Sequence, residues 1–220
     1  MSLQSDLEAT GLVLLGGFTP DADHTLPELT GGRRPKTVAV VGSAGPTMWA
    51  HLKEAPEFAS DPHPVNAWSQ RVLLGLAKTC GAEVVFPFDG PPYWPFQQWL
   101  MALPGTSQSP LGVVVHVRYG PWYALRGALL FGEESEFKTK KTGPGPCPGC
   151  IEKPCLDACP SGALTRAHPF HAGVCRDYVR ENANKDCTER GCLVRHACPY
   201  GRDYAYLPEQ ARHHMLAFAG

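Results

Sequence analysis

Cysteines are distributed very unevenly along this chain of 220 residues. Eight of the nine lie between Cys147 and Cys198, whereas residues 1–146 contain only Cys80. A short stretch this rich in thiols buries little apolar surface, so its order depends on what the thiols bind. In a reducing compartment, such thiols serve as metal ligands or redox groups rather than as disulfides.

The N-terminus and the charge balance indicate the compartment. Residues 1–6 lack the basic and apolar stretches of a signal peptide, and the longest apolar runs are only as long as a strand. The formal net charge of −1 provides no general attraction to nucleic acid or to an anionic membrane. We therefore expect a cytoplasmic protein that partners neither nucleic acid nor membrane.

The eight clustered cysteines form two groups, each of which ends in Cys-Pro. The groups are Cys147-x2-Cys150-x4-Cys155-x3-Cys159-Pro160 and Cys175 followed by Cys187-x4-Cys192-x5-Cys198-Pro199. Bacterial two-cluster ferredoxins use the spacing C-x2-C-x2-C-x3-C-P, in which the last cysteine ligates the other cluster. The sequence therefore predicts two [4Fe–4S] clusters, although the gap before Cys155 is wider than in that pattern.

Crossed ligation divides the eight cysteines into two sets. The first quartet is Cys147, Cys150, Cys155 and Cys198, and the second quartet is Cys159, Cys175, Cys187 and Cys192. The alternatives are zinc sites or buried free thiols. Zinc usually takes its ligands from two C-x2–4-C pairs and does not need a Cys-Pro ending. Cys80 is at the end of a predicted helix and is interpreted as a core thiol.

The rest of the chain predicts an α+β domain around one sheet. Short apolar runs predict strands, and apolar residues at helical spacing predict helices. The strands are expected at 11–17, 36–42, 82–86, 112–119 and 122–131, and the helices at 64–80 and 96–103. The charged and then Gly/Pro-rich stretch 138–146 is typical of a connector, so the predicted domains are 1–140 and 141–220.

One segment of the first domain resembles a known family. Residues 115–130, V-H-V-R-Y-G-P-W-Y-A-L-R-G-A-L-L, resemble the H-P-R-F-G-G-W-F-A-I-R-G-V-V-L stretch of the cblC family of cobalamin-processing chaperones. Weaker likeness extends to residues 46–49 and 11–14. The resemblance implies a flavin-reductase/nitroreductase-like fold that binds cobalamin base-off. The corrinoid-binding residues that it implies are Arg126, Trp122, Gly120 and Pro46. Here Val117 and Pro121 replace a motif proline and a motif glycine.

The order of the cysteine groups resembles epoxyqueuosine reductases and reductive dehalogenases, which couple a corrinoid domain to a two-cluster ferredoxin module. This resemblance implies a small bacterial-ferredoxin-like domain at residues 141–220. Together the two resemblances imply an oxidoreductase that passes electrons from two clusters to a corrinoid and takes them from a flavoprotein or ferredoxin. The alternative is a non-catalytic ferredoxin-type carrier whose first domain docks a redox partner. Neutral imidazole is a common metal ligand, but the resemblance implies a corrinoid bound without a protein histidine below the cobalt, so His116 is expected to be structural.

Overall fold

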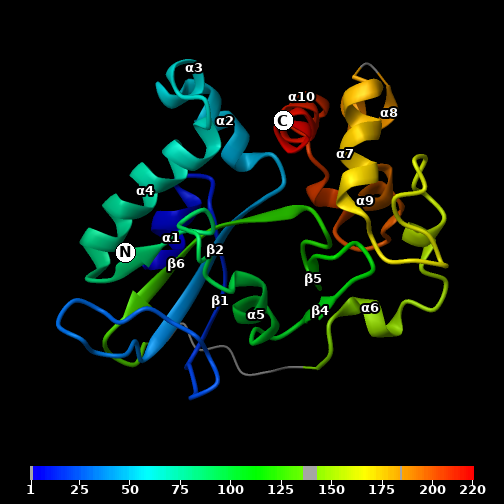
Figure 1. Cartoon of the computed structure of the whole chain (residues 1–220). Helices are drawn as coiled ribbons and strands as arrows, with labels where there is room; N and C mark the ends of the chain where they lie inside the picture. Colours follow the sequence, from blue (N-terminus) through cyan, green and yellow to red (C-terminus); the bar gives the residue numbers. More distant parts are fainter. Residues whose placement is uncertain (1, 136–142, 184) are drawn as a thin grey trace. The chain divides into compact units, whose positions relative to one another are not determined.

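The computed structural model describes residues 2–135, 143–183 and 185–220 (Figure 1). The predicted domain boundary at residues 140 and 141, and most of the predicted connector, lie outside the described residues. The elements of the first part are α1 (Leu3–Glu8), β1 (Val13–Phe18), β2 (Thr37–Ala44), α2 (Thr47–Glu54), α3 (Glu57–Ser60), α4 (Pro64–Cys80), β3 (Glu83–Val85), α5 (Phe96–Met101), β4 (Thr106–Gln108), β5 (Val114–His116) and β6 (Tyr123–Phe131). Those that follow are α6 (Pro146–Gly149), η1 (Pro154–Leu156), α7 (Ala172–Glu181), α8 (Asp186–Arg190), α9 (Leu193–Ala197), η2 (Arg202–Tyr204) and α10 (Pro208–Ala219). Across the described residues, no helix combines the length and apolar character that a membrane span requires.

The chain divides into two compact units. The first comprises Met1–Pro104 and Ala124–Thr142, and the second comprises Gly105–Tyr123 and Gly143–Gly220. The segment 105–123 therefore lies with the cysteine-containing part of the chain, whereas the predicted domains placed it in the N-terminal domain. This segment, which we call the inserted segment, includes the beginning of the stretch that resembles the cblC family.

A four-stranded sheet in the order β1-β2-β6-β3 forms the centre of the first unit. β1 runs antiparallel to β2, with an irregularity between Leu14 and Gly16, and β3 runs antiparallel to β6. All eight residues of β2 are buried, as expected of an interior strand that is covered on both faces. Helices α1 and α4 pack against β1 and β3 (Figure 1). The predicted strands at 11–17, 36–42, 82–86 and 122–131 are confirmed.

Helix α4 illustrates how local sequence determines this unit. Pro64 occupies the first turn, where a missing N–H costs nothing, and Gly81 ends the helix in the left-handed conformation with φ of 69°. Trp68 and Leu73 are almost fully buried in the core with residues of the sheet. The predicted helix at 64–80 is confirmed with these bounds.

The second unit combines the two-stranded antiparallel sheet β4-β5 with short helices. Helix α10 packs against α7 and α8 (Figure 1). Within the described residues from 143 to 220, the chain forms helices, turns and loops and contains no strand. The described structure therefore does not show a ferredoxin-like sheet in this region, and the ferredoxin-like fold stays a prediction.

Two glycines join the inserted segment to the chain that follows Cys198. Gly120 has a φ of 57°, and a Cβ on it would lie 2.0 Å from the carbonyl oxygen of Tyr200. Gly201 has a φ of 70°, and a Cβ there would lie 2.2 Å from the carbonyl carbon of Tyr119. Only glycine permits both this backbone conformation and this close approach. The two segments therefore contact each other backbone to backbone.

Candidate functional site

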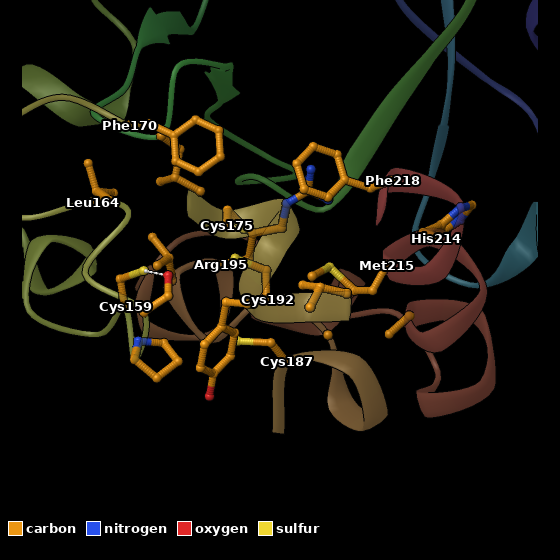
Figure 2. A pocket seen from close by; sticks show the side chains of 18 of the residues that line it. Cys159, Leu164, Phe170, Cys175, Cys187, Cys192, Arg195, His214, Met215 and Phe218 are labelled. Carbon is orange, nitrogen blue, oxygen red and sulfur yellow. Dashed lines mark hydrogen bonds between the residues drawn. The ribbon is translucent and has the colours of Figure 1, made fainter. Parts of the chain in front are cut away.

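The second quartet surrounds a cavity of about 290 Å³ in the second unit. Figure 2 shows its four cysteines gathered around this space, with Phe170, Met215 and Phe218 on the same walls. Cys175 lies on α7 and Cys187 on α8, while Cys192 immediately precedes α9. Three short helices and the loop at Cys159 thus bring four thiols from distant sequence positions to one apolar cavity.

The first quartet lines a separate, smaller cavity of about 20 Å³ in the same unit. Cys147 lies on α6, Cys150 directly follows it, and Cys155 lies on η1. Cys198 joins them from the end of α9. The structure therefore groups the eight cysteines in the two sets that crossed ligation predicts, each around its own cavity.

The crossed distribution of the cysteines between the two cavities has a simple structural origin. Helix α9 is only five residues long, and Cys192 at its start faces the second cavity while Cys198 at its end faces the first. The segment that begins with η1 also contributes to both cavities, because Cys155 lines the first cavity and Cys159 lines the second. Since η1 and α9 pack against each other, two short segments deliver one thiol each to both sites.

The electrostatics of the thiols follow the same division. Burial, and then the three other thiols of the second quartet, raise the pKa of Cys175 to about 11. Burial, and then the three other thiols of the first quartet, raise the pKa of Cys155. Negative charge on one thiol thus opposes ionisation of its neighbours within a quartet. Four thiolates at such a site would need a positively charged partner.

Cys159 differs from these thiols. Although burial opposes it, hydrogen bonds from the Ser161 hydroxyl and from three backbone N–H groups hold the pKa of Cys159 below its ordinary value. The Ser161 oxygen lies 3.3 Å from the Cys159 sulfur, and this is the contact drawn as a dashed line in Figure 2. Cys159 is therefore well suited to be a thiolate.

In the described part of the chain, no group of three or more His, Cys, Asp or Glu side chains is arranged to hold a metal ion. A single tetrahedral ion needs each sulfur at about 2.3 Å, which places the sulfurs within about 4 Å of one another. The cysteine sulfurs that hold a cubane cluster lie farther apart, because each thiolate binds a different iron at a separate corner. Each quartet lines a cavity.

Sequence reasoning missed the contribution of the inserted segment. Leu111 is the residue that lines both cavities, and it packs in the apolar cluster with Leu164 and Val194. Ser107, on β4, accepts a hydrogen bond of 3.0 Å from the backbone N–H of Cys147. No motif marks these positions, because neither a leucine at a turn nor a serine on a strand is distinctive in a sequence.

The residues predicted to contact a corrinoid are distributed over both units. Trp122 and Gly120 lie in the second unit, whereas Arg126 on β6 and Pro46 before α2 lie in the first. Trp122 lines the cavity of the second quartet, and its ring contacts His196 and Tyr206 edge to face. Its Nε1 atom is buried and has no hydrogen-bond partner among the described residues. The contact with Tyr200 explains Gly120 without a ligand.

His116 has a structural environment. Its Nδ1 atom accepts hydrogen bonds from the backbone N–H groups of Arg118, at 3.0 Å, and Tyr119, at 3.3 Å. Burial, and then the charge of Arg118, lower the pKa of His116 to about 4. The ring is therefore neutral at physiological pH and holds the turn between β5 and β6, as the sequence predicts.

Comparison with known proteins places the fold. No family model and no curated protein sequence matches the chain. Among solved structures, the B12-trafficking protein CblC of C. elegans, a homologue of human MMACHC, matches with a TM-score of 0.53 and 14% sequence identity. The match covers 97% of this chain and 88% of that chain. This chain therefore has a mixed α/β fold similar to that of the B12-trafficking protein.

Proposed function

We propose that this chain is an electron-transfer protein that holds one [4Fe–4S] cluster on each quartet and delivers electrons to a bound corrinoid. The observation that carries the proposal is the division of eight cysteines into two sets of four around separate cavities. Crossed ligation by the two Cys-Pro cysteines produces the same two sets. If the cysteines were only buried free thiols, the sets around the cavities would have no reason to match the sets that crossed ligation predicts.

The chemistry of the donors supports iron–sulfur clusters over zinc. All eight ligands are cysteines, the donors that hold such clusters in proteins. The thiols raise one another's pKa values, so iron would stabilise the thiolate forms that burial alone opposes.

The residues around the quartets would each have a role. The clusters supply one-electron transfer, and hydrogen bonds to their sulfurs and exclusion of water adjust the potential. Leu111, Leu164 and Val194 keep the space around the thiols apolar. The Ser161 hydroxyl and the neighbouring backbone N–H groups stabilise negative charge on Cys159. The protein thus holds the thiolates, orients donors toward them and limits access of water.

Two observations support a corrinoid as the electron acceptor. The fold is similar to that of a protein described as a B12-trafficking protein. Trp122, which belongs to the stretch that resembles the cblC family, has a buried N–H without a partner among the described residues. Such a donor fits a ligand with carbonyl oxygens, and the amide side chains of a corrinoid provide them.

The first prediction concerns metal content. Protein reconstituted without oxygen should contain about eight iron atoms and about eight acid-labile sulfides per chain, with a brown colour that dithionite bleaches. Iron and sulfide analysis with absorbance and EPR spectra measures this directly. A colourless protein that binds zinc stoichiometrically would contradict the proposal.

The second prediction concerns the corrinoid. Titration with cob(II)alamin should convert its spectrum to the base-off form. Arg126→Ala should weaken binding by about 1–3 kcal/mol if the arginine donates charge-assisted hydrogen bonds to the ligand. Lys78→Ala removes the same charge from an exposed position on α4 and should not change the affinity. If the wild-type spectrum is unchanged while iron is bound, the chain is instead an electron carrier that docks a partner.

A further inference from the structure

Each quartet has one cysteine that lies beside a serine hydroxyl. In the second quartet, the Ser161 oxygen lies 3.3 Å from the sulfur of Cys159 (Figure 2). In the first, the Ser107 oxygen accepts a hydrogen bond of 3.0 Å from the backbone N–H of Cys147, and the Ser107 side chain counteracts the rise that burial causes in the pKa of the Cys147 thiol. The two serines come from different parts of the second unit, the loop after Pro160 and strand β4.

The direction of these hydrogen bonds is determined once the cysteines bind iron. A ligated cysteine has lost its proton, so its sulfur can only accept. The Ser161 oxygen already accepts a hydrogen bond from the backbone N–H of Ala163, at 3.2 Å, which leaves its proton available for Cys159. Ser107 has the same arrangement, because its oxygen accepts from the Cys147 N–H.

We propose that Ser161 and Ser107 are positioning residues that separately set the reduction potentials of the two clusters, Ser161 through Cys159 and Ser107 through Cys147. This inference rests on the proposed function. A reduced cluster carries one more negative charge than an oxidised one, and a hydroxyl that donates to its thiolate stabilises the reduced form more. Each serine therefore raises the potential of the cluster whose ligand it contacts.

The buried position of Ser107 strengthens the effect. Its side chain is 5% exposed, so water cannot replace the lost donor easily when the hydroxyl is removed. Ser161 is half-buried and lines the larger cavity. A hydrogen bond in such surroundings is electrostatically stronger than one in water.

The test uses the full-length reconstituted protein and two alanine variants. EPR-monitored redox titration should show that Ser161→Ala lowers one midpoint potential and that Ser107→Ala lowers the other. Each variant should leave the midpoint potential of the other cluster unchanged. Ser161→Thr and Ser107→Thr retain the hydroxyl and should restore the wild-type values.

Ser69 provides a matched control. It is a buried serine on α4 in the first unit, and its hydroxyl donates to the carbonyl of Val65, at 2.6 Å. Ser69→Ala should therefore leave both midpoints unchanged. Alanine variants with full iron content and wild-type midpoints would overturn the inference, as would a loss of iron that the threonine variants do not repair. Wild-type protein that binds no iron would overturn the proposed function instead.

Discussion

Gly120→Ala is expected to lower the free energy of unfolding of the second unit by about 3 kcal/mol. The new methyl group would lie 2.0 Å from the carbonyl oxygen of Tyr200, a distance that no real contact permits. The backbone at Gly120 has a φ of 57°, which costs alanine additional energy. The neighbour is backbone rather than a flexible side chain, so the chain after Cys198 must move.

A matched variant separates the steric contribution from the cost of the backbone conformation. Gly143 belongs to the same unit and has a similar φ of 68°, but a Cβ there would have no atom within 4 Å. Gly143→Ala should therefore cost only about 1 kcal/mol, the conformational penalty alone. Denaturant titration with hydrogen exchange of residues 185–220 measures both variants. Equal destabilisation by the two changes would mean that the contact with Tyr200 does not restrain the unit.

This contact also explains why the unit boundaries could not be predicted. The sequence pattern predicts the strands and helices of the first unit, because apolar periodicity and the Pro64 and Gly81 signals act locally. The placement of the inserted segment depends on a meeting of two glycines far apart in the sequence. A single glycine in a sequence indicates a turn, and nothing in it indicates which distant backbone will approach.

The grouping of the cysteines follows from a different feature of the sequence. Spacing and the Cys-Pro endings predict which thiols belong together, and the same two sets line the two cavities. The clusters themselves stay a prediction. The walls of the site were not predictable in this way. Leu111 lines both cavities, and Ser107 accepts a hydrogen bond from the backbone N–H of Cys147. Both residues belong to the inserted segment, whose membership in this unit depends on tertiary contacts.

Helix α9 lies between Cys192 and Cys198, which line different cavities. The prediction with the largest effect follows from this arrangement: a single substitution should remove a whole cluster. Cys198→Ala should reduce the iron content from about eight to about four atoms per chain, and Cys159→Ala should do the same at the other site. Because metal binding contributes directly to folding in small cysteine-rich regions, both variants should also lose protection against proteolysis in residues 143–220. Cys80→Ala, in the first unit, should change neither property.

Pairs of substitutions distinguish crossed from sequential ligation. If Cys159 belongs with the nearby Cys147, as its sequence position suggests, the Cys147→Ala/Cys159→Ala protein should keep about four iron atoms. The two cavities predict the opposite, because these cysteines line different sites, and the double variant should lose nearly all its iron. Cys147→Ala/Cys198→Ala should in turn retain one intact cluster, because both cysteines line the first cavity. Iron analysis that gives the reverse order for the two double variants would show that α9 does not deliver its two cysteines to separate clusters.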